Sequence, residues 1–227
     1  MSPRTYQLGL RQAAADRTRN RIIAAARELL GAGGGPVSFN VEAVARLAGV
    51  TRVTIYRHFA SKLGLLEALY DDLGRRGLVA RLTAAFQVPA PLDALAALID
   101  AFCHFWESDR VVLRRLRGLA VVDPEVEQGL RARDARRREG LRAMMARLDA
   151  RPAQGPLERA EILDVIFVLT SFETFDMLSW QERSAQQVTA LVKKLVLAAL
   201  GPDHGGIPPP AAGRTRGAIR HRADHPA

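Results

Sequence analysis

Two short apolar patterns separated by Gly49 constrain the fold of this 227-residue chain more than any other feature of its sequence. Before the glycine, apolar residues recur at the three- and four-residue spacing of a helix, at Val41, Val44, Ala45 and Ala48. After it, in the stretch VTRVTIYRHFASK (residues 50–62), only Ile55 and Phe59 are spaced for a core. Glycine readily adopts the left-handed conformation of a tight turn, so we predict two helices joined at Gly49.

Residues that commonly cap helices stand at the expected starts of these helices and of the next one. Asn40 precedes the first short helix, Thr51 the second, and Ser61 the helix that follows. A side-chain oxygen at such a position accepts a hydrogen bond from a backbone N–H of the first turn. The arrangement predicts a helix-turn-helix, preceded by a helix that begins at Asp16 and ends at the run GAGGGP, residues 31–36.

The second helix of this motif has two unlike faces. Ile55 and Phe59 share one face. Val53 and Arg57 lie about 160° around the helix from it. A recognition helix in the DNA major groove needs this combination of an apolar anchor and an exposed cationic face. Arginine can bind guanine through two hydrogen bonds, and Val53 or Thr54 can contact a thymine methyl group.

Positive charge is concentrated at the N-terminal end of the chain. Residues 1–62 contain ten Lys and Arg against three Asp and Glu, a net charge of +7 out of +9 for the whole chain. Residues 63–200 contain nineteen of each sign and are neutral. Arginine could serve only to keep helices soluble, but an excess confined to the first quarter of the chain favours a polyanionic partner such as nucleic acid.

Composition and periodicity predict an all-α protein with nine helices, three in the basic segment and six after it. Alanine, leucine and arginine dominate, and Val, Ile and Thr are too scattered to form strands. The six later helices are expected at residues 61–86, 92–106, 111–122, 125–148, 157–180 and 185–200. No apolar run reaches about 18 residues, no signal-peptide core is visible, and Cys103 is the single cysteine. We therefore expect a cytoplasmic protein without membrane contact.

No pattern in the sequence indicates a catalytic or cofactor site. A Gly-rich phosphate loop, a nucleophile elbow and zinc-ligand spacing are all missing. Asp100, Cys103 and His104 lie together on one predicted helix but lack further obvious metal ligands. We expect no enzyme activity, no cofactor and no metal, with Cys103 buried as a small apolar residue and His104 hydrogen-bonded.

The segment NVEAVARLAGVTRVTIYRHFASK, residues 40–62, and the helix before it resemble the TetR family of bacterial regulators. The family pattern is matched at Ala45, Ala48, Gly49, Val50, Thr51, Thr54, Tyr56, Phe59, Ser61 and Lys62. One departure is Leu63-Gly64, where relatives often carry a glutamate and a helix former, which questions the rigidity of the helix start there. The resemblance implies DNA contacts by Asn40, Thr51, Arg52, Val53, Thr54, Tyr56, Arg57, His58 and Lys62. Lys62 would hold a phosphate, whereas His58 and Tyr56 could instead pack against the core.

The resemblance also implies a small-molecule effector and a homodimer, because relatives use the helical body for both. Larger side chains on helices 92–106, 125–148 and 157–180 could line a pocket for a mainly apolar ligand, or be ordinary core: Phe102, Phe105, Trp106, Met144, Phe167, Phe172 and Phe175. The expected dimer contacts are Leu178, Val188, Leu191 and Leu195. Glu173 could pair with an arginine across the subunit boundary or face a polar ligand group.

These expectations divide the chain into four segments. They are a flexible arm at residues 1–15, a helix-turn-helix DNA-binding domain at 16–62, a ligand-binding and dimerisation domain at 63–200, and a disordered basic tail at 201–227. The favoured function is a ligand-responsive transcriptional regulator, a repressor released from a palindromic double-stranded DNA operator; activation is the alternative mode. An architectural DNA-binding protein is disfavoured by the neutral body, and an enzyme with a DNA-binding domain by the missing catalytic groups.

Overall fold

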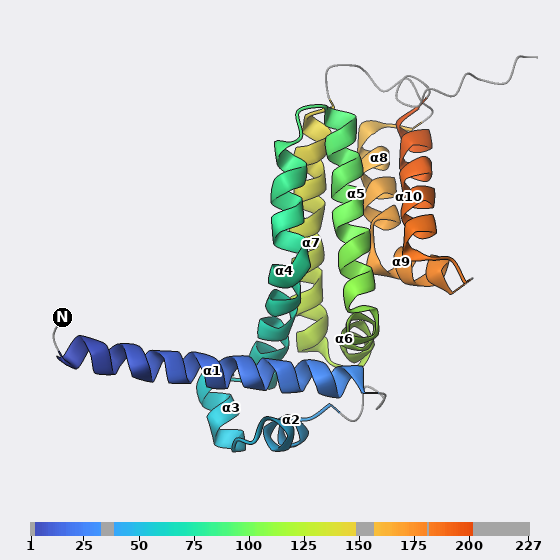
Figure 1. The fold of residues 1–227 in the computed structure, drawn as a ribbon. Coiled ribbons are helices and arrows are strands. Elements are labelled where there is room, and N and C mark those ends of the chain that lie inside the picture. The colour runs from blue at the N-terminus through green and yellow to red at the C-terminus, as the bar shows by residue number, and fades with distance from the viewer. Residues whose placement is uncertain (1–2, 33–38, 149–156, 181, 202–227) are drawn as a thin grey trace, which may run out of the picture.

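The computed structural model describes residues 3–32, 39–148, 157–180 and 182–201, and every regular element in these ranges is an α-helix. The elements are α1 (Pro3–Gly31), α2 (Val41–Ala48), α3 (Arg52–Phe59), α4 (Lys62–Gln87), α5 (Pro91–Ser108), α6 (Arg110–Val122), α7 (Pro124–Ala146), α8 (Arg159–Leu169), α9 (Phe172–Ser179) and α10 (Ala185–Leu200). Figure 1 shows α1 lying across one end of an upright bundle of α4, α5, α7, α8 and α10, with α2 and α3 below α1. The all-α prediction is confirmed.

Local capping signals start and stop the helices of the helix-turn-helix as predicted. Asn40 Oδ1 accepts a hydrogen bond from the Ala43 N–H at 2.7 Å, and Thr51 Oγ1 accepts one from the Thr54 N–H at 3.2 Å. Gly49 ends α2 with φ of 60°, in the left-handed region that favours glycine. These bonds fix the angle at which α3 leaves α2.

The junction between α3 and α4 is tight. Ala60 has a positive φ of 62°, and the Ser61 N–H donates to the Phe59 carbonyl oxygen at 2.7 Å. A Cβ atom added at Gly64 would lie 2.1 Å from that same oxygen, closer than atoms can approach. The glycine that departs from the family pattern is therefore required by a close backbone approach, and it does not loosen the start of α4.

The first helix is longer than expected. It begins at Pro3, whereas the sequence suggested a flexible arm over residues 1–15 and a start at Asp16. Residues 3–15 contain several strong helix formers, and each added residue of a growing helix gains a backbone hydrogen bond. Asp16 lies inside α1 and accepts a side-chain hydrogen bond from Gln12 at 3.0 Å.

The helix expected at residues 157–180 is two helices, so the described ranges contain ten rather than nine. Thr170 ends α8, and Ser171 begins α9 by accepting a hydrogen bond from the Thr174 N–H at 3.2 Å. The Thr174 hydroxyl in turn donates to the Val168 carbonyl oxygen at 2.7 Å. Side-chain groups that compete for the backbone in this way interrupt an otherwise apolar helix.

Contacts between charged groups tie α1 to the rest of the bundle. Arg27 of α1 lies 2.6 Å from Asp109, which separates α5 from α6. Arg115 of α6 donates to the Leu30 carbonyl oxygen near the end of α1. A displacement of α6 would therefore act directly on α1 through these contacts.

A buried carboxylate joins α6 to α9. Asp176 accepts hydrogen bonds from Arg110 Nε at 2.7 Å and from Arg114 Nη2 and Nε at 2.6 and 2.9 Å. Burial acts to raise the pKa of Asp176, but the hydrogen bonds from the two arginines prevail, and this pKa lies below its usual value. The group is charged at neutral pH and orients the short helix α9.

Some expectations lie outside the described residues: most of the GAGGGP run, the loop at residues 149–156, and the tail beyond Gly201. Within the described ranges, none of the helices combines the length and hydrophobicity that crossing a bilayer requires.

Candidate DNA interface and ligand pocket

The exposed face of α3 is the candidate DNA-reading surface. Ile55 is fully buried and Phe59 is 7% exposed, α3 packs against α2 and α4, and the guanidinium of Arg19 on α1 lies over the Phe59 ring. On the other side, Val53 is 75% exposed and Arg57 is also exposed. The Arg57 side chain makes no hydrogen bond or ion pair with any residue that the structure describes. The predicted separation of an apolar anchor from a cationic outer face is present.

Arg52 is engaged within the helix-turn-helix. Its Nη1 lies 2.6 Å from Glu42 Oε1 on α2, and its Nη2 donates to the Tyr56 hydroxyl at 3.2 Å. The hydrogen bond to Tyr56 and the charge of Glu42 raise the pKa of this guanidinium above its usual value. A base contact by Arg52 requires it to leave Glu42, whereas Arg57 has no such partner to leave.

Several other predicted DNA-contact residues have structural roles in the free protein. Asn40 and Thr51 cap α2 and α3, and Thr54 Oγ1 lies 2.9 Å from Thr51 Oγ1. Tyr56 and His58 are half-buried. These side chains pre-order the surface and keep only part of their polar groups free for DNA.

Lys62, the predicted phosphate ligand, forms an ion pair in this structure. Its Nζ lies 3.2 Å from Asp123 Oδ2, at the N-cap of α7. Burial acts to raise the pKa of Asp123, but hydrogen bonds from Lys62 and from the Val126 N–H outweigh it and lower the pKa. The first residue of α4 is thereby held by the junction of α6 and α7.

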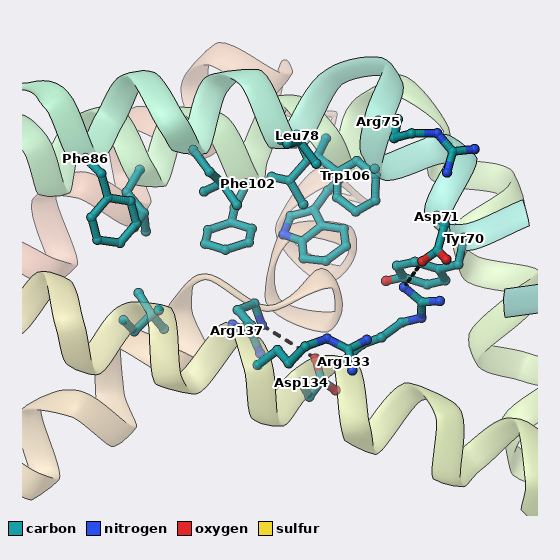
Figure 2. A pocket seen from close by; sticks show the side chains of 18 residues that line it. Tyr70, Asp71, Arg75, Leu78, Phe86, Phe102, Trp106, Arg133, Asp134 and Arg137 are labelled. Carbon is teal, nitrogen blue, oxygen red and sulfur yellow. Dashed lines mark ion pairs between the residues drawn. The ribbon is translucent and has the colours of Figure 1, made fainter. Parts of the chain in front are cut away.

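A pocket of about 410 Å³ opens between α4, α5 and α7. Figure 2 shows Phe86 at one end, Phe102 and Leu78 along the middle, and charged groups at the other end. The lining residues are Tyr70, Asp71, Gly74, Arg75, Leu78, Val79, Leu82, Phe86, Leu98, Phe102, Phe105, Trp106, Arg133, Asp134, Arg136, Arg137, Gly140 and Leu141. This size and mainly apolar lining suit a small organic ligand.

Three of the seven pocket residues named from the sequence line this cavity: Phe102, Phe105 and Trp106. The other four, Met144, Phe167, Phe172 and Phe175, are absent from its wall. Met144, Phe172 and Phe175 are core residues at 0%, 3% and 1% exposure. Phe167 lies beneath the guanidinium of Arg137, with 4.0 Å between the guanidinium carbon and the ring centroid.

Sequence reasoning missed the charged wall of the pocket, which α7 supplies through Arg133, Asp134, Arg136 and Arg137. The signal was present, because residues 133, 136, 137, 140 and 141 follow the three- and four-residue spacing of one helix face. Arginines on a charged helix are more often solvated, so the spacing alone did not single them out.

The charged end of the pocket is organised by ion pairs. Arg133 Nη1 lies 2.7 Å from Asp71 Oδ1, and its guanidinium stacks 4.5 Å from the Tyr70 ring centroid. Burial raises the pKa of the Tyr70 hydroxyl, which stays protonated at neutral pH. Glu173 pairs with Arg117 of the same chain at 2.6 Å, and a partner across a subunit boundary or on a ligand stays a prediction.

The four predicted dimer residues are unequally accessible. Val188 is fully buried within its own chain, with Val192, Val196 and Leu200 on the same face of α10. Leu178 and Leu191 are half-buried, and Leu195 is 41% exposed. Apolar side chains on α8, on α9 and at the end of α9 are more exposed: Val168, Met177 and Trp180 at 57%, 63% and 69%.

Asp100, Cys103 and His104 on α5 do not form a group that could hold a metal ion. Cys103 is buried as expected, and Asp100 pairs with Lys193 at 2.7 Å. The His104 side chain is exposed and makes no hydrogen bond with the described residues, contrary to the expectation. No group of three potential metal ligands occurs in the described part of the chain.

Comparison with known proteins gives one family match and many similar folds. Residues 22–69 match the family model of bacterial regulatory proteins, tetR family. A search of curated protein sequences gives no match.

Solved structures share the fold over most of the chain. A protein of Rhodococcus sp. described as a TetR-family transcriptional regulator has a TM-score of 0.66 and 17% identity, covering 82% of this chain and 99% of its own. A similarly described protein of Syntrophomonas wolfei has a TM-score of 0.67 and 13% identity, over 82% and 96%. NalD of Pseudomonas aeruginosa, the secondary repressor of the MexAB-OprM multidrug efflux pump, has a TM-score of 0.63 and 21% identity, also over 82% and 96%.

The family match covers the helix-turn-helix with its supporting helix and the start of α4, and the remaining helices follow the same fold as the solved regulators. Residues 22–69 are thus similar to the TetR family of bacterial regulatory proteins, and the all-helical fold is that of the solved TetR-family regulators.

Proposed function

We propose that this protein is a cytoplasmic, homodimeric transcriptional repressor that a small molecule releases from a palindromic operator. The observation that carries the proposal is α3, anchored by Ile55 and Phe59 while it exposes Val53 and Arg57. We assign DNA binding to residues 16–62 and ligand binding and dimerisation to residues 63–200. The N-terminal part of α1 extends the first domain.

The DNA contacts divide by what each side chain is free to do. Arg57 and Val53 read base edges, because both are exposed and Arg57 has no partner among the described residues. Arg52 joins them after it leaves Glu42. Lys62 and Tyr56 hold phosphate oxygens and set the position of α3 on the duplex.

Dimerisation uses the exposed apolar face formed by Val168, Met177, Trp180 and Leu195. An apolar face of this kind is more stable against a second copy than in water. A two-fold axis through it presents two copies of α3, and such a pair reads half-sites separated by about one helical turn of DNA or a multiple.

The ligand acts through α4. This helix forms one wall of the pocket, begins at Lys62, and follows directly on α3. A ligand that shifts α4 against α5 or α7 therefore moves α3 without touching a DNA-facing side chain. Ligand and operator must weaken each other's binding by the same factor. The repressor function of the structurally similar NalD supports repression over activation.

The test is binding of the full-length protein to duplex DNA from upstream of its own gene, measured by gel shift. We expect a salt-sensitive shift that unrelated DNA competes for poorly, and loss of this shift with at least one member of a small-molecule panel. Equal affinity for all duplexes would favour an architectural protein, and ligand binding without any change in the shift would remove the release mechanism.

A further inference from the structure

The wall of the ligand pocket carries an excess of positive charge. Its lining includes four arginines, Arg75, Arg133, Arg136 and Arg137, against two carboxylates, Asp71 and Asp134. Arg75 also pairs with Asp72, outside the lining, at 3.4 Å, so the surplus lies on Arg136 and Arg137. Both carboxylates are already partnered. Asp71 pairs with Arg133 at 2.7 Å, and Asp134 lies 3.5 Å from both Arg117 and Arg137. A cationic ligand would find no free counter-charge here, and the surplus charge faces the cavity.

Arg137 is the most deeply placed of these cations. Its side chain is only 6% exposed, and its Nη1 donates to the Phe167 carbonyl oxygen and to Thr170 Oγ1 at 2.8 and 3.0 Å. Its Nε is buried and lies 3.5 Å from Asp134 Oδ1, but it makes no hydrogen bond with the described residues. Burial lowers the pKa of this guanidinium, and the nearby Asp134 only partly offsets the effect. The charge is therefore incompletely compensated in the free protein.

Arg136 is the second cation available to a ligand. It lines the same pocket, is exposed, and makes no hydrogen bond or ion pair with any described residue. It is adjacent to Arg137 on α7 and closer to solvent. The pocket wall thus offers one buried and one exposed arginine from α7.

Another part of the wall, at the Phe86 end of the pocket, is apolar. Leu82, Phe86 and Leu98 line the pocket from α4 and α5, and Figure 2 shows Phe86 at the end opposite Asp71 and Arg133. A neutral apolar ligand would displace water from the cavity and leave Arg137 less solvated, which is unfavourable. A ligand with an apolar body and one acidic group satisfies both parts of the wall.

We propose that the effector of this regulator is an amphipathic organic anion, with its acidic group on Arg137 and Arg136 and its apolar body along Leu82, Phe86 and Leu98. The assignment rests on the regulator function proposed above, and it specifies the chemical class of the ligand. The shared chemistry is a single carboxylate or phosphate on an apolar chain.

The test compares four probes with the same ten-carbon chain: decanoate, decyl phosphate, 1-decanol and decylamine. Their dissociation constants for the full-length protein are measured by calorimetry below the critical micelle concentration. At least one of the two acids should bind fivefold or more tightly than the alcohol, and the amine should bind most weakly. The tighter acid identifies the headgroup as carboxylate or phosphate. A preference for both acids below fivefold, or tightest binding of the amine, would overturn the proposal.

Variants locate the acidic group. Arg137→Gln and Arg136→Gln should each reduce the acid-over-alcohol affinity ratio at least threefold. Arg142→Gln is the matched control, because Arg142 lies on α7, is exposed, pairs with Glu139 and does not line the pocket. The Arg136 side chain makes no hydrogen bond or ion pair with the described residues, so Arg136→Gln should fold normally. This variant therefore tests the position of the acidic group even where Arg137→Gln fails to fold. An unchanged ratio in Arg136→Gln and in any folded Arg137→Gln protein would refute the assignment.

Operator binding separates this proposal from the function on which it rests. If the alcohol binds as tightly as the acids and releases the operator equally well, the anionic class is wrong and the regulator stands. If the protein binds no operator, the regulator proposal fails, and the four dissociation constants still decide the chemistry of the pocket.

Discussion

Replacing Asp123 by asparagine tests whether Lys62 leaves its carboxylate partner when the protein binds DNA. The Lys62 side chain is 37% exposed and the Asp123 side chain 27% exposed. Solvent therefore screens the ion pair between them, in which the two charged atoms lie 3.2 Å apart. Such a pair contributes about 0.2–1 kcal/mol. Asparagine caps helices as well as aspartate, so Asp123→Asn removes the charge and keeps the start of α7.

The expected result is tighter DNA binding. Lys62 no longer has to break an ion pair before it contacts a phosphate, so affinity should rise about 1.4- to 5-fold per subunit, equivalent to ~0.2–1 kcal/mol. The affinity for operator DNA and for unrelated DNA should rise by the same factor, because a phosphate contact carries no sequence information. Lys62→Ala should weaken both and reduce the slope of log affinity against log salt by about 0.9.

The assay is fluorescence anisotropy with labelled duplexes at several fixed salt concentrations, applied to the wild type, both single variants and the double variant. Loss of a negative charge also strengthens DNA binding at long range, and the double-mutant cycle removes that contribution. Glu125→Gln is the matched charge control, because Glu125 is exposed and makes no ion pair with the described residues. If Asp123→Asn strengthens binding equally with and without Lys62, the exchange of partners does not occur.

The pH dependence of the affinity gain in Asp123→Asn follows from the lowered pKa of Asp123. A carboxyl group whose pKa is lowered by folding stabilises the protein fully above the unfolded pKa of about 4, and this contribution is lost as the pH falls through the folded value. The affinity difference between wild type and Asp123→Asn should therefore be constant between about pH 6 and pH 8.

Four further substitutions test other parts of the structure. Arg57→Ala should weaken operator binding by about 1–3 kcal/mol and relax the preference at one or two base pairs, measured on single-base-pair operator variants; equal losses on all DNA would indicate a phosphate contact. Leu195→Glu should yield monomers in light scattering, because it places a charge on the exposed apolar face; a stable dimer would contradict the proposed interface. Asp176→Asn should lower the free energy of unfolding by about 2–3 kcal/mol in urea titrations at neutral pH and fixed protein concentration, since the two arginines of α6 lose their carboxylate. That difference should vanish as the pH falls through the lowered pKa of Asp176, and a pH-independent difference would refute it. Gly64→Ala should weaken operator binding in anisotropy measurements and lower the melting temperature, because the added methyl group meets the Phe59 carbonyl oxygen; unchanged values would show that the α3–α4 junction can adapt.

The helix-turn-helix could be predicted from the sequence because its determinants are local. Asn40, Thr51 and Ser61 each accept a hydrogen bond from three residues ahead, and Gly49 adopts its left-handed conformation within a single turn. The break at Ser171 is equally local, but the apolar residues around it concealed the signal.

The pocket could not be predicted as well, because its wall combines three helices that are distant in sequence. Of the aromatic residues expected at a pocket, Phe102, Phe105 and Trp106 line the cavity, and their use by a ligand stays a prediction. Phe172 and Phe175 are also aromatic residues on a largely apolar segment, but they are buried in the core. Lys62 and Asp123, sixty-one positions apart, meet only through tertiary packing. Glycine at position 64 was expected to loosen a junction, whereas the chain path makes it a steric requirement.

The interruption between α8 and α9 connects the pocket to the exposed apolar face. The carbonyl oxygens of Phe167 and Thr170, at this interruption, accept hydrogen bonds from Arg137 and from Trp106 Nε1, both of which line the pocket. An anion that draws Arg137 away would withdraw a donor from the backbone beside Val168, which belongs to that face. Subunit association and ligand occupancy are then linked equilibria, so the apparent ligand affinity should vary with protein concentration. The abundance of the regulator in the cell would itself set the effector level at which it responds.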